Sequence, residues 1–292
     1  MTYIVKQEVK GHPYYYLVHN QRTAEGWKKH KLYVGKTIPD EKHLNSLKNK
    51  LGKSQPALPR TRFQRQQFLT NDEKHELSTI HHKSFEDETA FLIRFSMHTN
   101  GIEGSRLDAA DTRKILTRHE SPQGKKLREI YEAVNTEEAY HYIKNYEGDV
   151  NKKFLLRLHE IMMAKILPDA GRLREKNVKV VGAGFAPPVQ QNVELEIERL
   201  LSFYRYLKKH YTAAEVAALL HIKFIELHPF SDGNGRVGRL LLNFILMRND
   251  MPPIVITKDE KKEYFRLLSH AIEEKEYGKF VKFVFTHVTS HR

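Results

Sequence analysis

The sequence contains no cysteine among its 292 residues. This absence excludes disulfide scaffolds, thiolate zinc sites and cysteine nucleophiles. No apolar run approaches the roughly 18 residues that a membrane-spanning helix needs, and the first residues lack the apolar core of a secretory signal. With only 15 glycines and 11 prolines, the chain is neither collagen-like nor of low complexity. We therefore expect a cytoplasmic protein with no membrane contact.

The chain has a globular composition, with its positive charge concentrated at one end. Hydrophobic residues make up 40% and charged residues 29%. The net charge of +13 favours anionic partners such as nucleotides, nucleic acid or acidic surfaces. Residues 1–70 hold ten lysines and four arginines against four acids, a net +10, which leaves about +3 for the rest. This asymmetry predicts a basic N-terminal region and linker at 1–70 and a larger domain at 71–292.

The basic N-terminal region has the pattern of a small β-structure. Aromatic and β-branched residues alternate with polar ones from Ile4 to Lys36, and a turn-like segment at 22–26 predicts a β-hairpin. A polar helix is possible at about 40–53, and the proline-containing segment 54–59 ends it. Aromatic and cationic side chains interleave here, namely Tyr14, Tyr15, Tyr16, Trp27 and Tyr33 with Lys28, Lys29, Lys31 and Lys36. Such a surface could bind nucleic acid, recognise a target protein or dock onto the helical domain, and all three remain open.

The rest of the chain has helical periodicity, and Asn71-Asp72 is a candidate cap for its first helix. Apolar residues at helical spacing predict helices at roughly 72–98, 108–118, 123–146, 151–165, 191–208, 212–227, 234–248, 259–274 and 277–288. The single strand-like interruption, residues 177–188, predicts a short β-hairpin flap between helices. The predicted fold class is mainly α, a helical bundle with a β-hairpin flap.

The most informative stretch is residues 228–239, His-Pro-Phe-Ser-Asp-Gly-Asn-Gly-Arg-Val-Gly-Arg. The residue before a proline is pushed out of the α region, so Pro229 ends the preceding helix and leaves His228 at a helix end beside a loop. Phe230 is expected to fill the core. A histidine in this position alone is more often a helix cap than a catalytic group.

The second half of this stretch predicts a phosphate-binding site. Residues 233–235, Gly-Asn-Gly, open an apolar helix whose free N–H groups and dipole attract an anion. Arg236 and Arg239 stand on one face of its first turns, with His228 and Asp232 at the rim. A Gly-Asn-Gly turn by itself is usually only a turn, but all these features within twelve residues are hard to explain in that way.

Residues 228–239 resemble the signature of Fic proteins, His-x-Phe-x-(Asp/Glu)-Gly-Asn-Gly-Arg-x-x-Arg, with every fixed position present. The resemblance extends over roughly 85–290, because residues 158–160, 169–174, 177–188 and 251–255 recur in the family's order. It implies a Fic-type bundle that uses Mg²⁺ and transfers AMP from ATP to a Ser, Thr or Tyr hydroxyl of a target protein.

The resemblance also implies a role for each signature residue. His228 would be the general base, and Asp232 would hold Mg²⁺ against the phosphates. The α-phosphate would lie on Asn234 and the backbone amides of Gly233 and Gly235, and the other two phosphates on Arg236 and Arg239. Further nucleotide contacts are expected at Val237 and Gly238, at Val181 and Gly182, and at Tyr264 and Phe265 as candidate walls for adenine. The chain departs from the family at Ile272, where an asparagine that contacts the base is common.

The flap of this family pairs with a target. The resemblance implies that Val178 to Gly184 would add a strand to the target's backbone and present its hydroxyl in line. A plain connecting hairpin is the other interpretation of this segment.

Residues Thr99 to Gly104 are similar to the inhibitory motif (Ser/Thr)-x-x-x-Glu-(Gly/Asn) of many Fic proteins. The motif would end a helix at about 85–104, and Glu103 would pair with Arg239 in the place of the γ-phosphate. Asn100-Gly101 is expected to interrupt the helix just before Glu103. Without the signature downstream, an ordinary glycine-capped helix end would explain this segment better.

Two alternatives remain for the function. A transferase of the same fold could move UMP, phosphate or a phosphocholine group, although Gly233 argues against the phosphotransfer subtype, which usually has lysine there. A nucleic-acid-binding regulator could instead use the Fic site as a nucleotide sensor. A homodimer is possible, and the sequence does not decide the oligomeric state.

Overall fold

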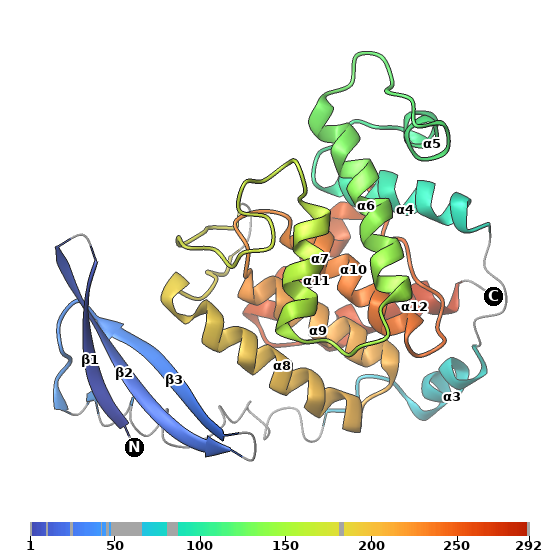
Figure 1. Cartoon of the computed structure of the whole chain (residues 1–292). Coiled ribbons are helices and arrows are strands. Elements are labelled where there is room, and N and C mark those ends of the chain that lie inside the picture. Colours follow the sequence, from blue (N-terminus) through green and yellow to red (C-terminus); the bar gives the residue numbers. More distant parts are fainter. Residues whose placement is uncertain are drawn as a thin grey trace.

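The structure is a computed structural model, and it describes residues 2–9, 11–23, 26–41, 43–44, 47, 66–80, 87–180 and 184–290. Within these residues, a three-stranded sheet precedes ten α-helices (Figure 1). The sheet lies at one side of the helical body, where its last strand contacts α8 (Val193–His210) and the 3₁₀ turn η1 (Gln190–Asn192). Of the alternatives for the N-terminal region, contact with the helical domain is therefore observed.

The sheet is antiparallel, in the order β1 (Thr2–Val9), β2 (His12–Thr23), β3 (Gly26–Gly35). The predicted hairpin is β2 and β3, and β1 is an additional strand that the sequence analysis did not separate. One face of the sheet is covered by a short helical segment, because buried Leu17 packs against Leu44. The remainder of the helix predicted at 40–53 lies largely outside the described residues.

Apart from the one expected at 72–98, the predicted helices are present with small shifts at their ends. Besides α8, they are α3 (Asn71–Thr79), α4 (Glu88–Ile102), α5 (Ala109–Arg118), α6 (Leu127–Asn145), α7 (Lys152–Met162), α9 (Ala213–Leu227), α10 (Asn234–Met247), α11 (Lys261–Glu273) and α12 (Gly278–Thr289). The single helix predicted at 72–98 is wrong, because α3 ends at Thr79 and Ile80 is extended. Thr70, not Asn71-Asp72, caps α3, since Thr70 and Glu73 exchange the two hydrogen bonds of a capping box.

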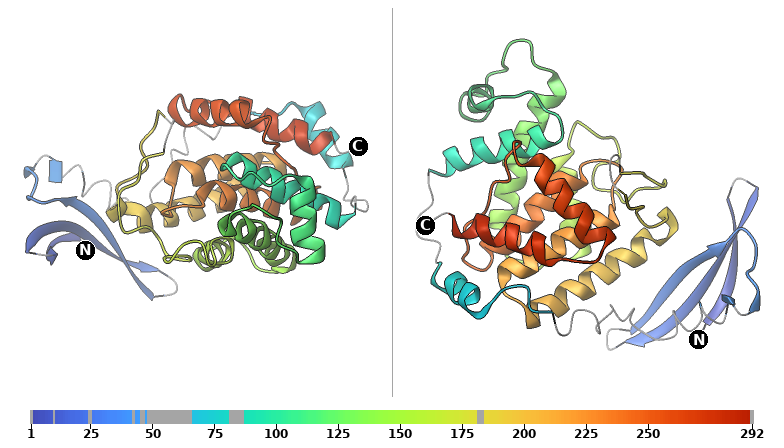
Figure 2. Two further views of the ribbon diagram at one scale, coloured as in Figure 1. Left: turned by 90° about the horizontal axis from the view of Figure 1, so that it is seen from above. Right: turned by 180° about the vertical axis from the view of Figure 1, so that it is seen from behind.

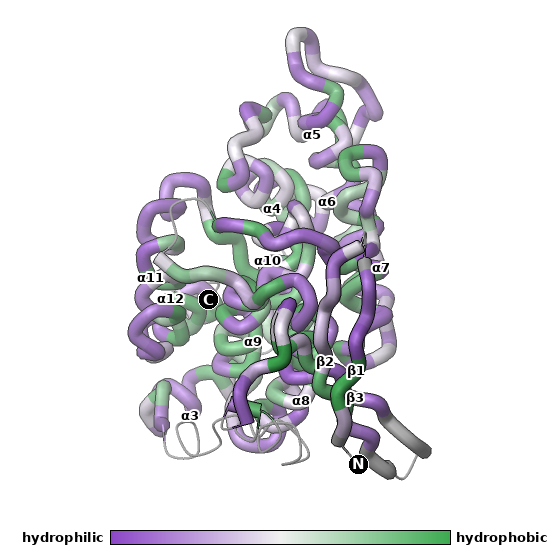
Figure 3. The backbone as a smooth tube through the Cα atoms, turned by 90° about the vertical axis from the view of Figure 1, so that its left-hand side faces the viewer, coloured by the Kyte–Doolittle hydropathy of each residue, from purple (hydrophilic) through white to green (hydrophobic). Residues whose placement is uncertain are grey.

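Helices α9 and α10 form the centre of the domain. Seen from above, α11 and α12 lie on one side of them, and α6 and α7 lie on the other (Figure 2). Hydrophobic residues concentrate along α9 and α10, whereas the outer helices carry many hydrophilic ones (Figure 3). Because α9 is apolar and buried nearly all round, it fixes the position of His228 at its end. None of the helices in the described part of the chain is long and apolar enough to cross a membrane.

Helix α4 continues without a break through Asn100 and Gly101, so the predicted interruption is wrong. The side chain of Asn100 is buried, and its Nδ2 donates to the carbonyl of Glu132 and to Oγ1 of Thr136, both at 3.1 Å. These contacts with α6 outweigh the low helix propensity of Asn-Gly. The helix therefore extends far enough to carry Glu103 at its C-terminal end.

The flap lacks the β-strands that were predicted, as far as its described residues 177–180 and 184–188 show. The N–H of Gly184 donates instead to Glu273 Oε1 at 3.0 Å, and Pro187 and Pro188 have no N–H to give to a strand partner. Val181 and Gly182, which were expected to contact the nucleotide, lie outside the described residues.

Candidate active site

His228 ends α9 and begins the loop that leads to α10. Its backbone is left-handed, with φ 49° and ψ 61°, and its N–H donates to the carbonyl of Phe224. The helix ends here as predicted, because Pro229 disfavours the α conformation at the preceding residue. The loop then runs through residues 229–233 to the first turn of α10.

The side chain of Asn234 closes this loop on itself. Its Oδ1 accepts from the N–H of Phe230 and its Nδ2 donates to the carbonyl of Phe230, both at 3.0 Å. The ring of Phe230 is buried, as expected, and stacks on His159 with the ring centroids 3.7 Å apart. Asn234 is only 2% exposed, so its observed contacts shape the loop. A phosphate contact by its side chain stays a prediction.

The side chain of His228 is in the form that a general base requires. Nδ1 lies 3.3 Å from the carbonyl oxygen of Ile225. A carbonyl can only accept, so Nδ1 carries the proton and Nε2 keeps the lone pair. Burial lowers the pKa of His228 and outweighs the hydrogen bond to the Ile225 carbonyl, which raises it; the positive charge of Arg174 lowers the pKa further, against opposing effects of Glu103 and Asp232. The imidazole is therefore neutral at physiological pH.

At the N-terminus of α10, two glycines lie so close to neighbouring side chains that a larger residue would not fit. Gly233 is left-handed at φ 79°, and a Cβ there would lie 2.6 Å from Sδ of Met163. At Gly235 a Cβ would lie 2.3 Å from Oε1 of Glu103. The Glu103 carboxylate thus lies directly against the first turn of α10, where unpaired N–H groups and the helix dipole favour an anion.

The predicted ion pair of the inhibitory motif is present. Nη2 of Arg239 donates to Oε1 of Glu103 at 2.7 Å and to the carbonyl of Thr99 at 2.9 Å, and Nε donates to Oγ1 of Thr99 at 2.7 Å. Arg239 is 3% exposed, whereas a third of the Glu103 side chain is open to solvent. Nη1 of Arg239 has no acceptor among the described residues. Gly104 follows with φ 105°, a conformation that glycine adopts easily.

The other signature arginine belongs to a closed ring of four charges. Nη1 of Arg236 donates to Oε1 of Glu132 at 2.8 Å, and its Nη2 lies 3.6 Å from Oδ1 of Asp232. Arg128 completes the ring, with Nε 3.0 Å from Glu132 Oε1 and Nη2 2.8 Å from Asp232 Oδ2. Arg236 and Glu132 are buried, whereas the side chains of Arg128 and Asp232 are about half exposed. The side of the ring formed by Arg128 and Asp232 is therefore the side open to a ligand.

Asp232 fits the role of a carboxylate that binds a substrate-borne cation. Burial raises its pKa, but the charge of Arg236 and hydrogen bonds from Gly233 and Arg128 outweigh burial and hold the pKa below the usual value. In the described part of the chain, no cluster of three acidic or histidine residues is placed to hold a metal ion. One ionised carboxylate together with phosphate oxygens is the ligand set that Mg²⁺ commonly uses.

The residues expected around adenine differ in their exposure to solvent. Tyr264 has no exposed surface, its hydroxyl lies 2.8 Å from Nε2 of His221, and burial raises its pKa to about 12. Tyr264 is thus a core residue of α11 and not an open wall for a base. Phe265, its neighbour, is 41% exposed and remains available as one. Ile272 is buried on the same inner face of α11 as Tyr264.

Val237 and Gly238 also face away from the anion site. Val237 has no exposed surface, and a Cβ on Gly238 would meet Ile225 and His221 of α9 at 3.0 to 3.2 Å. These two residues therefore let α10 pack tightly on α9. Nucleotide contacts at these two positions stay a prediction.

Three site residues were not singled out from the sequence, namely Arg128, Glu132 and Arg174. Arg128 and Glu132 are spaced i, i+4 on α6, a pattern that is common on exposed helices and so carries no signal for a site. Arg174 lies in the segment 169–174 that resembles the family, but its role depends on contacts with backbone carbonyl groups, of which those of Pro188 and His228 lie 14 and 54 positions away.

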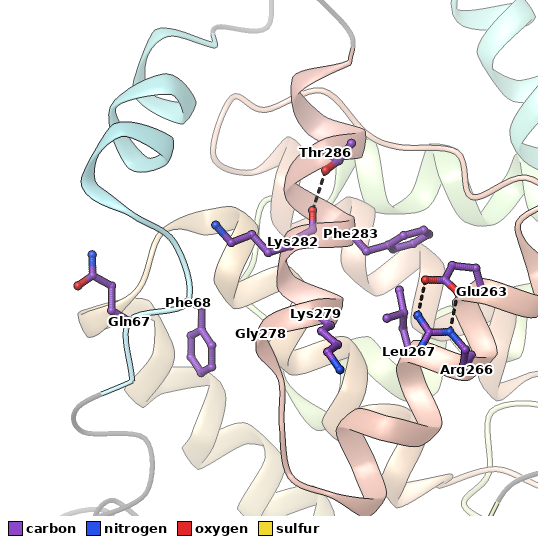
Figure 4. Close-up of a pocket in the computed structure, with 10 residues that line it drawn as sticks. All are labelled: Gln67, Phe68, Glu263, Arg266, Leu267, Gly278, Lys279, Lys282, Phe283 and Thr286. Atoms are coloured by element: carbon purple, nitrogen blue, oxygen red, sulfur yellow. Dashed lines mark hydrogen bonds and ion pairs between the residues drawn. The ribbon is translucent and has the colours of Figure 1, made fainter.

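A hollow of about 610 Å³ lies elsewhere, between α11, α12 and the segment that precedes α3 (Figure 4). Phe68, Lys279 and Phe283 are among the residues that line it, together with the ion pair of Glu263 and Arg266. None of the signature residues lines this hollow.

Comparison with known proteins agrees with the geometry. Residues 149–246 match the Fic/DOC family. Over 194 residues the chain is 34% identical to protein adenylyltransferase Fic of Drosophila ananassae, covering 64% of this chain and 38% of that protein. Over 278 residues it is 30% identical to the protein of the same name from Drosophila persimilis, covering 92% of this chain and 47% of that one. The chain thus spans less than half the length of these curated relatives.

Solved structures show the same fold. A Fic domain containing signaling protein from Bacteroides thetaiotaomicron superposes with a TM-score of 0.66 at 23% identity, over 75% of this chain and 93% of that one. Fic-1 from C. elegans superposes with a TM-score of 0.63 at 26% identity, over 86% of this chain and 72% of that one. The chain is therefore a Fic/DOC domain protein, homologous over most of its length to the protein adenylyltransferases Fic.

Proposed function

We propose that this protein transfers AMP from ATP to a hydroxyl side chain of a target protein, and that Glu103 restrains the reaction. The observation that carries the proposal is the loop 228–233. One end of this loop bears a neutral histidine with its lone pair on Nε2, and the other end is the N-terminus of α10. Protein adenylyltransferase is also the activity that the names of the curated relatives give.

In this reaction the target's hydroxyl oxygen attacks the α-phosphorus of ATP while its proton passes to Nε2 of His228. The bond from the α-phosphorus to the oxygen that bridges to the β-phosphate breaks, and pyrophosphate leaves with the electron pair. Because burial keeps the pKa of His228 low, the imidazole is ready to accept the proton at neutral pH.

The phosphates would be held by the residues around α10. The N–H groups and dipole at its first turn would stabilise the charge that develops on the α-phosphate. Arg236 and Arg239 would bind the other two phosphates. Mg²⁺ would supply further neutralisation of the phosphates, with Asp232 as its protein ligand, and Arg128 must release Asp232 for this to happen.

The restraint by Glu103 follows from where its carboxylate lies. It accepts a hydrogen bond from the Arg239 guanidinium at 2.7 Å and lies next to Gly235. The carboxylate and the γ-phosphate of ATP would therefore compete for the same position. Nucleotide would then bind in a pose from which transfer is slow. Replacing Glu103 would free both the guanidinium and the first turn of α10.

The test is intact-mass analysis of the purified chain after incubation with ATP and Mg²⁺. Glu103→Gly should gain the mass of one or more AMP groups, and the double variant Glu103→Gly/His228→Ala should not. If ATP adds no AMP but another donor nucleotide adds the mass of UMP, or the added mass is that of phosphate, the protein is another transferase of this fold.

The N-terminal sheet favours a second candidate function, binding of single-stranded nucleic acid. The ring of Tyr33 lies 5.5 Å from that of Tyr16 and 6.0 Å from that of Tyr14, measured between centroids. Lys31 and Lys36 place their Nζ atoms over the rings of Tyr16 and Tyr14 at 3.9 and 5.9 Å. Aromatic rings with adjacent cations are suited to bases and phosphates.

This second function is tested by titrating a fluorescent single-stranded oligonucleotide with the whole chain at several salt concentrations. Lys29→Gln/Lys31→Gln/Lys36→Gln should reduce the slope of log affinity against log salt by about 2, since each lost phosphate contact removes roughly 0.7. The control replaces three lysines of α11 and α12, Lys261, Lys262 and Lys279, with glutamine. Equal slopes for both triple variants would contradict binding by the sheet.

A further inference from the structure

Arg174 is a buried cation that no carboxylate neutralises among its described partners. It is 2% exposed, and all the acceptors of its guanidinium are backbone carbonyls. Burial lowers its pKa, with no acidic side chain contributing in the other direction. Burying an unpaired charge is costly, so an arginine in this place needs a specific electrostatic reason.

The first reason is the end of α9. Nε of Arg174 donates to the carbonyl of His228 at 2.8 Å, and the N–H of Arg174 donates to the carbonyl of Pro229 at 3.0 Å. His228 is the C-cap of α9, where the helix dipole is negative and unpaired carbonyls accumulate. The carbonyls at this helix end thus take the place of a carboxylate partner for the guanidinium, and the guanidinium in turn stabilises the left-handed conformation that directs the His228 side chain.

The second reason is the flap. Nη1 of Arg174 donates to the carbonyl of Lys176 at 2.9 Å, and Nη2 donates to the carbonyl of Pro188. Lys176 immediately precedes the flap, and Pro188 is its last residue. One planar guanidinium therefore joins both stems of the flap and the main chain of the histidine. Only arginine presents donors in such a fork, since the ammonium of lysine is a single point.

We propose that Arg174 is a positioning residue of the transfer reaction, which fixes both stems of the flap relative to the main chain of His228. This inference rests on the proposed function in one respect. If the flap holds the target, Arg174 keeps the target's hydroxyl at a constant position relative to His228, the base that deprotonates it. The contacts of Arg174 themselves do not depend on that function.

The charge of Arg174 has an effect that can be separated from its shape. The charged groups that act on the His228 imidazole are Arg174, Glu103 and Asp232, together with the carbonyl of Ile225 at Nδ1. Of these, Arg174 opposes protonation and the others favour it. Removing the positive charge of Arg174 should raise the pKa of His228. Replacing the planar guanidinium with another cationic group should leave that pKa nearly unchanged.

The experiment compares Arg174→Lys, which keeps the charge, with Arg174→Met, which keeps only length and apolar volume. Arg157→Met is the control, because Arg157 is an exposed arginine paired with Glu160. Amide hydrogen exchange is measured on peptides that cover 175–190, and the pKa of His228 is measured by NMR of histidine-labelled protein, with the resonance assigned by His228→Gln.

Both Arg174 variants should speed exchange in the flap by about tenfold, the effect of losing hydrogen bonds to a charged group. Arg174→Met should also raise the pKa of His228, and Arg174→Lys should not. In the Glu103→Gly background, both should reduce the rate of self-modification at saturating ATP more than they change the KM for ATP. The control should change none of these quantities.

Flap exchange that stays as in the wild type in Arg174→Lys overturns the inference. So does a His228 pKa that moves equally in both variants. If Arg174→Met does not fold, flap exchange in Arg174→Lys alone tests whether Arg174 holds the flap. A second measurement on the wild type then applies: the guanidinium protons of Arg174 must exchange more slowly than those of Arg157. If Glu103→Gly transfers nothing, the proposed function fails, while exchange and titration still report on Arg174.

Discussion

Replacing Glu103 with glycine tests how strongly the carboxylate holds the site closed. The variant removes the 2.7 Å contact with Arg239 but leaves both hydrogen bonds from Arg239 to Thr99. The backbone of Glu103 is in the ordinary right-handed region (φ −86°, ψ −2°), so glycine fits there without strain. The fold should therefore be kept, and the change should act on ligand binding.

The magnitude follows from the environment of the pair. A hydrogen bond between charged groups contributes about 1.5 to 3 kcal/mol. Because a third of the Glu103 side chain is exposed, solvent screening favours the lower end. About 1.5 kcal/mol corresponds to roughly tenfold, so self-modification by Glu103→Gly should exceed that of the wild type by about tenfold or more.

The assay measures incorporation of label from α-phosphate-labelled ATP at equal nucleotide concentration. Glu103→Gln should give an intermediate increase, since the amide keeps the shape but loses the charge. The matched control is Glu274→Gly, because Glu274 is exposed and is the C-cap of α11 with nearly the same backbone conformation. Arg239→Ala should not be activated, because it removes the restraint and a phosphate ligand together. Equal labelling by the wild type and Glu103→Gly would refute the inhibitory role of this contact.

Four further substitutions and a change of pH are expected to have measurable effects. His228→Ala should reduce transfer by about 10² to 10⁴ with ATP affinity by calorimetry nearly unchanged, and undiminished labelling would remove it as the base. Because the pKa of His228 is lowered below 6.5, the transfer rate should be flat above about pH 7 and fall only once the pH drops below that lowered pKa. Asp232→Ala should lose activity at low Mg²⁺ and recover partly with excess Mg²⁺, and wild-type activity at low Mg²⁺ would contradict the metal role. Arg128→Ala should lower the half-saturating Mg²⁺ concentration by up to about fivefold, the upper value for a half-exposed ion pair, and an unchanged value would show that Arg128 does not compete. Phe230→Ala should destabilise the fold by about 3 to 5 kcal/mol in urea unfolding, because its ring is fully buried.

Apart from the Glu103–Arg239 pair, which the family resemblance implied, the parts of the site that were predicted correctly are those set by neighbouring residues. The end of α9 at His228 depends on Pro229, and the start of α10 depends on the left-handed Gly233. The errors arose where contacts with distant residues outweigh local preference. Asn100-Gly101 stays helical because α6 supplies acceptors for the Asn100 side chain, and Tyr264 is turned into the core because His221 of α9 offers its hydroxyl a partner.

The sequence by itself therefore determined the helical class, most helix boundaries and the loop that joins a base to an anion site, because these follow from turn chemistry and periodicity over a few residues. Only the tertiary structure decided how that loop is held. Arg236 meets Glu132 across 104 positions of sequence, and Arg174 meets His228 across 54. The pair of Arg239 and Glu103, across 136 positions, was expected only from the resemblance to a known family. Such contacts between charged or backbone groups have no periodic signature, since any buried arginine can satisfy its donors with whichever acceptors the packing of helices brings within reach.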